Sequence, residues 1–303
     1  MLGTLLGAIA AIAIGDPVHA QTVVDTYFND KTTTFRVADI QRKPVKKRPE
    51  SLGIKTSAQA VFVADLATGN VLYAKDPHKV MPIASLTKLV TAMVFLDLKP
   101  DLNKTLVFQP EDFDGESKPV FKPGEEITYR DALRSMLVGS VNACAKALAR
   151  TTLGEKKFVA AMNDKARALH LNTPTFVEPS GINPRNQSSA ADVAALIASA
   201  VAYPEVKANA QFSEVTIKGK SGQSYLIKTT NNLLGSFLNK KPYTITAAKT
   251  GSLPEAGYCM AQITRNERGN QVVAVELGSE NHFSRYQDIK ALTSWAFDAY
   301  EWK

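Results

Sequence analysis

The sequence predicts a mixed α/β (α+β) fold, in which an antiparallel sheet is flanked by helices and a mostly helical subdomain is inserted between its strands. Three observations support this prediction. Short β-type runs occupy residues 58–65 and 71–75. Helical patterning without obvious strands follows from about residue 101 to 202, and β-type runs return after residue 210. We therefore expect the two groups of strands to share one sheet.

Each element follows from a local pattern. Residues 68–70 form the turn of a first hairpin, and Leu86 opens an apolar helix face in a segment that ends at Pro100. Serines at 188 and 189 are suited to cap a helix. The other expected elements are helices at 128–138, 141–152 and 155–169, a hairpin at 214–218 and 224–229, strands at 244–249, 258–264 and 271–277, and a final amphipathic helix at 285–300.

The first 20 residues have the pattern of a signal peptide. Residues 2–14 are almost wholly apolar, a Gly-Asp-Pro break follows, and small side chains occupy positions −3 and −1 before Gln21. No Lys or Arg precedes the apolar run, so a retained N-terminal anchor is the alternative. We expect a periplasmic or otherwise exported protein, without a stable membrane anchor in the mature chain.

The rest of the chain divides into two parts. Residues 21–55 are interpreted as an extended basic leader or linker, and residues 56–303 as one domain that contains the helical subdomain. A chain of 303 residues with 45% hydrophobic and 21% charged residues can bury a substantial core. The body of the sequence has no apolar run long enough to cross a membrane.

The net charge of +7 suits an anionic envelope or wall polymer as partner. Nucleic acid is not expected, because no basic stripe is interleaved with aromatic residues, and the densest basic run, residues 42–49, fits a solvated linker. The four histidines show no metal-ligand spacing, and no phosphate-binding loop is present, so neither a metal nor a cofactor is expected. Cys144 and Cys259 have apolar neighbours and are expected to be buried free thiols, and a disulfide between them is the alternative in an exported chain.

Ser85 and Lys88 form a Ser-x-x-Lys motif and lie one helical turn apart. A serine hydroxyl is a weak nucleophile until a neighbouring base removes its proton. Partial burial and a second positive charge, which Lys249 can provide, would lower the pKa of Lys88 and make a neutral amine available. The helix N-terminus near Ser85 also favours developing negative charge.

A second motif, Ser140-x-Asn142, begins a helix in the helical block. The Ser140 hydroxyl can relay a proton between Lys88 and a leaving amine, while Asn142 can hold Lys88 and bind a substrate amide. Simple helix capping is the competing interpretation, and the two roles are compatible.

The third motif is Lys249-Thr250-Gly251, which we expect at the end of a strand. Lys249 and the Thr250 hydroxyl suit a substrate carboxylate, and Gly251 lets a substrate backbone approach closely. The N–H groups of Ser252 and Ser85 can form an oxyanion hole. Taken together and in this order, the three motifs provide the parts for acyl transfer through a serine ester.

These residues closely resemble the D-alanyl-D-alanine carboxypeptidase and endopeptidase family, the low-molecular-mass penicillin-binding proteins. The resemblance runs from about residue 57 to 303 and includes the three motifs, residues 64–69, residues 179–184 and residues 256–259. It implies the fold shared by serine β-lactamases and penicillin-binding-protein transpeptidases. It also implies that Ser85 attacks a D-Ala-linked peptide bond of peptidoglycan, with Lys88 as base and Ser140 as relay, and that β-lactam antibiotics acylate the enzyme.

By the same resemblance, Arg285 corresponds to a family arginine near the substrate carboxylate. The sequence departs from the family in having Ser252-Leu253 after the third motif, where a threonine often stands two residues beyond the glycine. The short C-terminus after the last predicted helix resembles the endopeptidase-type members. Two alternatives stay open: a β-lactamase of the same fold that uses Glu178, and a catalytically silent wall-binding protein.

Overall fold

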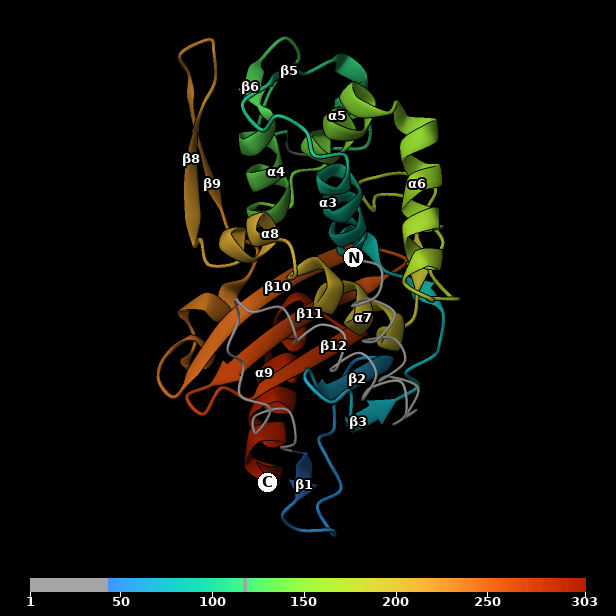
Figure 1. Ribbon diagram of the computed structural model, residues 1–303, viewed down its shortest axis with the longest axis vertical. Helices are drawn as coiled ribbons and strands as arrows, with labels where there is room; N and C mark the ends of the chain where they lie inside the picture. Colours follow the sequence, from blue (N-terminus) through green and yellow to red (C-terminus); the bar gives the residue numbers. More distant parts are fainter. Residues whose placement is uncertain (1–42, 117–118) are drawn as a thin grey trace, which may run out of the picture.

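The computed structural model describes residues 43–116 and 119–303, in which a sheet with its own helices lies beneath a mostly helical layer (Figure 1). The main sheet has the order β10-β11-β12-β2-β3, and every neighbouring pair is antiparallel. The prediction that the two strand groups share one sheet is therefore confirmed for the strands at 243–279, whereas the predicted hairpin at 214–229 forms a sheet of its own. The strands are β2 (Ala60–Asp65), β3 (Val71–Lys75), β10 (Tyr243–Leu253), β11 (Gly257–Asn266) and β12 (Gln271–Ser279).

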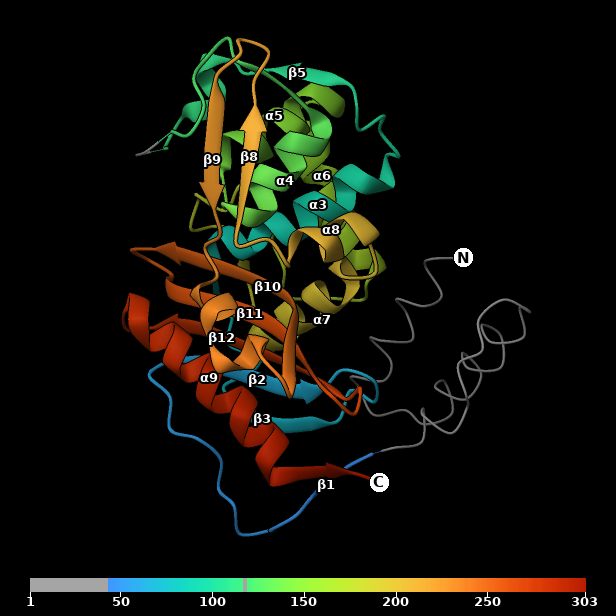
Figure 2. The same ribbon diagram turned by 90° about the vertical axis from the view of Figure 1, so that its left-hand side faces the viewer.

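Alternation along the strands divides the apolar side chains between two cores. On β2, Val61 and Val63 face the outer helix α9 (His282–Ala299) and pack with Ile289 and Leu292. Their neighbours on β2 join the other core, which continues from the opposite sheet face into the helical layer. Figure 2 shows α9 against one face of the sheet and α7 on the other.

The helical layer lies over this second face and contains the expected helices. Ser189 caps α7 by accepting a hydrogen bond from the Asp192 N–H, and Thr128 caps α4 by accepting one from the Asp131 N–H. The helices are α3 (Lys88–Asp97), α4 (Tyr129–Val138), α5 (Asn142–Thr152), α6 (Glu155–Ala168), α7 (Ala190–Ala200) and α8 (Pro204–Asn209), with 3-10 helices η2 (Ala84–Thr87) and η3 (Pro110–Phe113). Two further 3-10 helices, η4 (Asn232–Gly235) and η5 (Phe237–Asn239), instead pack in the core that contains α9.

Short strands interrupt the helical block, which the sequence had suggested to be without strands. β5 (Thr105–Val107) pairs with β6 (Glu126–Thr128), and β4 (Met81–Pro82) pairs with β7 (Gln187–Ser188). Strands of two or three residues are too short to produce a recognisable alternation, and they form here because antiparallel segments meet in the fold.

The hairpin of β8 (Glu214–Lys218) and β9 (Ser224–Lys228) forms a separate two-stranded sheet beside α4 (Figures 1 and 2). Its buried side chains, among them Ile217 and Tyr225, alternate with exposed ones. The hairpin buries this face against the helical layer and does not extend the main sheet.

The N-terminal part of the described chain pairs with its C-terminal end. β1 (Pro44–Lys46) is antiparallel to β13 (Tyr300–Trp302), so a strand forms inside the segment that we interpreted as a leader, residues 21–55. The predicted signal peptide and most of that leader lie outside the described residues. In the described ranges, none of the helices is long and apolar enough to cross a membrane. Cys144 and Cys259 are buried free thiols, as expected.

Candidate active site

The nucleophile candidate Ser85 lies in η2, where the chain turns from β4 into α3. Lys88 is the first residue of α3 and is fully buried. Its Nζ is 2.9 Å from the Ser85 Oγ. The local sequence achieves this contact because the two residues are one turn apart and the helix starts at the lysine.

Lys88 Nζ has two further partners, the Asn142 Oδ1 at 2.6 Å and the Ser180 carbonyl oxygen at 2.5 Å. Both are acceptors without a hydrogen to donate, whereas the Ser85 hydroxyl can donate as well as accept. A neutral amine has two N–H groups and one lone pair. In the neutral form, the two N–H groups of Lys88 are donated to Asn142 and Ser180, and its lone pair accepts the hydrogen of the Ser85 hydroxyl.

Burial lowers the pKa of Lys88 to about 8, and the negative charges of Glu178 and Glu116 partly oppose this effect. The sequence had suggested burial and the charge of Lys249 as the two causes. Burial is the cause that lowers the pKa of Lys88, whereas the repulsion between the two lysines lowers the pKa of Lys249. Burial, followed by the charges of Lys88 and Arg285, lowers the pKa of Lys249 well below its usual range.

The loop that presents the Ser180 carbonyl is held by Glu178. The Glu178 carboxylate accepts hydrogen bonds from the N–H groups of Ser180 and Gly181. Gly181 has a φ of +83°, and a Cβ there would lie 2.0 Å from the carbonyl oxygen of Ala84. Our sequence reasoning gave Ser180 no role. The sequence signal that could have identified Ser180 was the stretch Pro179-Ser180-Gly181, which is part of the family resemblance.

Ser140 lies in the turn between α4 and α5, with a left-handed φ of 59°. Its Oγ accepts a hydrogen bond from Lys249 Nζ at 2.7 Å. The second motif therefore touches both of the others, since Asn142 contacts Lys88 and Ser140 contacts Lys249. Val141 is the N-cap residue of α5, which leaves the side chains of Ser140 and Asn142 to these lysines.

We had predicted that the third motif ends a strand, and this was wrong. The motif lies inside β10, because pairing with β11 continues through Leu253. Gly251 allows β10 to pass against the nucleophile turn. A Cβ there would lie 2.9 Å from the Ile83 carbonyl oxygen and 3.1 Å from the Ser85 backbone nitrogen. Thr250 Oγ1 donates to Thr230 Oγ1 at 2.7 Å.

Arg285 reaches this strand from α9. Its Nη1 donates to the Gly251 carbonyl oxygen at 3.0 Å and its Nη2 to the Tyr286 hydroxyl at 2.9 Å. The guanidinium also lies over the Tyr258 ring, 5.4 Å from its centroid. Arg285 is thus fixed behind the third motif and adds positive charge beside Lys249.

A cavity of about 270 Å³ opens at Ser85. Sequence reasoning missed one of its lining residues, Glu116, because no motif surrounds it and it comes close to Asn142 only through the fold. The lining residues are Ser85, Gly115, Glu116, Asn142, Gly181, Ile182, Ser252 and Leu253. Among the described residues, no group of three or more His, Cys, Asp or Glu side chains is arranged to hold a metal ion.

Comparison with known proteins explains this arrangement. A family model described as D-alanyl-D-alanine carboxypeptidase matches residues 45–281. The chain belongs to this family. The D-alanyl-D-alanine endopeptidase of Pseudomonas aeruginosa is 35% identical over 263 residues, covering 84% of this chain and 82% of the relative. The D-alanyl-D-alanine endopeptidase of Escherichia coli is 32% identical over 244 residues, covering 78% of this chain and 76% of that relative.

Solved structures agree with this membership of the carboxypeptidase family. The Streptomyces K15 DD-transpeptidase has a TM-score of 0.75 and 25% identity, covering 81% of this chain and 99% of that one. Penicillin-binding protein D2 from Listeria monocytogenes, in its cefotaxime-bound form, has a TM-score of 0.71 and 28% identity with the same coverage. The predicted family and fold class are confirmed, and the chain is a serine-type hydrolase of the D-Ala-D-Ala peptidase class.

Proposed function

We propose that this protein cleaves the peptide bond after a D-Ala residue in peptidoglycan stem peptides or their cross-links, through an acyl-enzyme on Ser85. The observation that carries the proposal is the environment of Lys88. Its amine is buried, has a lowered pKa and donates to two acceptors. The lone pair of the neutral amine is then directed at the Ser85 hydroxyl.

In acylation, neutral Lys88 takes the proton of Ser85 as Oγ forms a bond to the substrate carbonyl carbon. The carbonyl oxygen becomes an oxyanion, which the N–H groups of Ser85 and Ser252 stabilise. When the C–N bond breaks, the Ser140 hydroxyl donates its proton to the leaving amine. Lys88 then transfers the proton it took from Ser85 to the Ser140 oxygen, so both side chains regain their starting protonation state. Lys249 donates to the Ser140 oxygen, so the hydroxyl hydrogen is directed elsewhere and is available for transfer.

Deacylation repeats these steps with water in place of the serine hydroxyl. Lys88 is neutral again after acylation and accepts a proton from the water that attacks the ester carbonyl. The ester C–O bond then breaks, and the same proton returns to Ser85. One water is consumed, one peptide bond is hydrolysed, and the enzyme regains its starting protonation state.

Lys249, Thr250 and Arg285 make the end of the site that binds a carboxylate. An arriving carboxylate favours the charged form of Lys249 and so offsets the effect of its burial. The Thr250 hydroxyl adds a hydrogen bond, and Arg285 contributes charge from behind the strand. A D-amino acid leaving group has a carboxylate at this position, which a typical internal peptide bond does not provide.

We further propose endopeptidase action on cross-links, β-lactam acylation of Ser85 and an exported location. The two bacterial relatives with 35% and 32% identity are named endopeptidases, and the chain covers most of their length. The Listeria monocytogenes neighbour is described as bound to cefotaxime. The N-terminal sequence pattern supports export.

The β-lactamase alternative requires a carboxylate that is free to activate water. Both carboxylate oxygens of Glu178 instead accept hydrogen bonds from its own loop, including Ser180, Gly181 and Asn186. A carboxylate committed to these donors fits a structural role. This observation favours the peptidase.

The test is intact-mass measurement after exposure to benzylpenicillin, with the Ser85→Ala variant beside the wild type. We expect a stable adduct of one penicillin on the wild type and none on the variant. Drug consumed without an adduct would support the β-lactamase, and drug left intact without an adduct would support the silent wall-binding protein. Cross-linked and uncross-linked muropeptides then separate endopeptidase from carboxypeptidase action.

A further inference from the structure

Glu116 lies in the cavity beside Ser85 and takes no part in the proposed acyl-transfer steps. It carries the only charge among the eight residues that line this cavity in the described part of the chain. The others are small, polar and uncharged, or aliphatic. A ligand group placed here therefore meets one carboxylate, which favours a cation.

The cavity lies toward the far end of the third motif. Ser252 and Leu253 line it, whereas Lys249, Thr250 and Arg285 do not. Under the proposed function the leaving amino acid occupies the carboxylate end at Lys249. The cavity then receives the other half of the substrate, namely the D-Ala that acylates Ser85 and the residue before it.

The Glu116 carboxylate is held in position by two successive N–H groups at the start of α5. Its Oε1 and Oε2 accept hydrogen bonds from the N–H groups of Asn142 and Ala143, each at 3.3 Å. These contacts are long, and each oxygen keeps a lone pair for a ligand. No hydrogen bond joins Glu116 to Lys88 in the described structure, because the Lys88 amine is already committed to its three partners.

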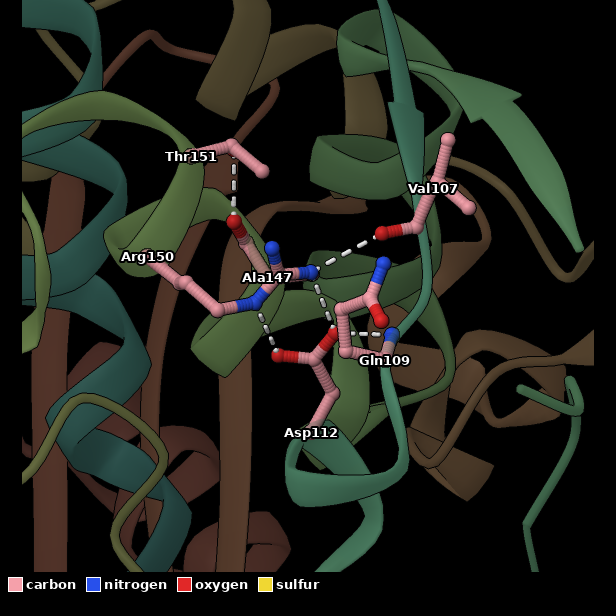
Figure 3. A network of polar contacts seen from close by, with 6 residues as sticks. All are labelled: Val107, Gln109, Asp112, Ala147, Arg150 and Thr151. Atoms are coloured by element: carbon pink, nitrogen blue, oxygen red, sulfur yellow. Dashed lines mark hydrogen bonds and ion pairs between the residues drawn. The ribbon is translucent and has the colours of Figure 1, made fainter. Parts of the chain in front are cut away.

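The segment that leads to Glu116 is fastened to the same helix. Arg150 of α5 forms two hydrogen bonds with Asp112 of η3, Nε to Oδ1 at 3.0 Å and Nη2 to Oδ2 at 2.7 Å (Figure 3). Arg150 Nη2 also donates to the Val107 carbonyl oxygen at 2.9 Å. This network fixes η3 against α5, so the Glu116 carboxylate has a defined place relative to Ser85.

We propose that Glu116 is a specificity-determining residue, which binds the side-chain ammonium of a diamino acid immediately before the D-Ala that acylates Ser85. This inference rests on the proposed peptidase function. In a peptidoglycan stem, a free ammonium distinguishes a donor peptide whose diamino acid is not itself cross-linked. Glu116 therefore selects donor stems by the state of that amine.

The experiment compares two peptides that differ by one acetyl group, Nα-acetyl-L-Lys-D-Ala-D-Ala with a free side-chain amine and the same peptide with that amine acetylated. A charge-assisted hydrogen bond predicts about a 10-fold or greater preference in kcat/KM for the free amine. Glu116→Gln should reduce the preference to about 2-fold or less, mainly by lowering kcat/KM for the free amine. If turnover is slow, the two peptides are compared by how well each one slows the acylation of Ser85 by benzylpenicillin.

Glu111→Gln is the matched control, because Glu111 is exposed on η3 and does not line the cavity. It should keep the wild-type preference. Equal kcat/KM values of the wild type for the two peptides would by themselves overturn the inference. Equal loss for both peptides in Glu116→Gln would assign Glu116 to the support of α5. The wild type still forms the benzylpenicillin adduct on Ser85 in either case, whereas failure of the proposed function would abolish that adduct.

Discussion

Lys88 Nζ lies 2.6 Å from the Asn142 Oδ1, and this contact joins the helix behind the nucleophile to the first residue of α5. The amide oxygen is neutral, so it orients the amine without stabilising its charge as a carboxylate would. That choice of residue keeps the lysine available as a base. The effect of the contact on the Lys88 pKa is open to direct test.

We expect Asn142→Asp to slow the acylation of Ser85 by benzylpenicillin about 10- to 1,000-fold near neutral pH, because an adjacent opposite charge typically moves a pKa by about 1 to 3 units. The carboxylate raises the pKa of Lys88 and keeps it protonated. The measurement is the second-order acylation rate as a function of pH. The rate should recover at higher pH. A uniformly lower rate with an unchanged pH profile would show that Asn142 acts on the substrate instead.

Wild-type acylation should rise with pH and level off above the Lys88 pKa of about 8. The sign follows from the base, which is active only when its amine is neutral. Glu116 raises the pKa of Lys88, so Glu116→Gln should move the midpoint to lower pH. Glu111→Gln should leave the midpoint unchanged. A rate that falls on alkalinisation would contradict the assignment of Lys88 as the base.

Gly251→Ala should reduce acylation about 100-fold while the fold is kept, because a displacement of roughly 1 Å at a reacting group costs about that much. The added Cβ would meet the Ile83 carbonyl oxygen at 2.9 Å and push β10 away from the Ser85 turn. Gly235→Ala is the control, since its added Cβ meets nothing within 4 Å. An acylation rate equal to that of the control would show that β10 can shift without effect on the site.

Glu276 gives a prediction about stability. It is fully buried in β12, where neither carboxylate oxygen accepts a hydrogen bond from an N–H or hydroxyl group of the described structure and the Asp288 carboxyl is the polar group beside it. Burial, and then the charge of Asp288, raises the pKa of Glu276 well above its usual range. The folded state therefore holds this proton at pH values where the unfolded state releases it. Stability falls as the pH rises from the ordinary glutamate pKa toward the folded value.

Glu276→Gln should remove this loss and raise the free energy of unfolding by about 1 to 3 kcal/mol at alkaline pH, where an unpaired buried group costs most. At acidic pH, below the ordinary glutamate pKa, the variant and the wild type should be similar. The measurement is denaturant unfolding across pH. Glu267→Gln, at an exposed position, should follow the wild type. Parallel stability profiles of Glu276→Gln and the wild type would refute the assignment.

The three motifs, the family and most of the helices and strands that carry them were predictable from the order of residues. The β-type runs at 58–65 and 71–75 form strands, and capping residues such as Ser189 mark helix starts, because these signals are local and depend only on side-chain size and polarity. The contact between Ser85 and Lys88 was equally predictable, since one helical turn separates them.

Other features of the site depend on segments that are far apart in the sequence and meet only in the folded chain. The lowered pKa of Lys88 comes from burial, the Ser180 carbonyl reaches it from a remote loop, and Glu116 meets Asn142 only because η3 is fastened to α5. The third motif lies within β10 because the partner strand β11 continues past it. Desolvation and pairing between strands are properties of the packed chain, and no local pattern of residues encodes them.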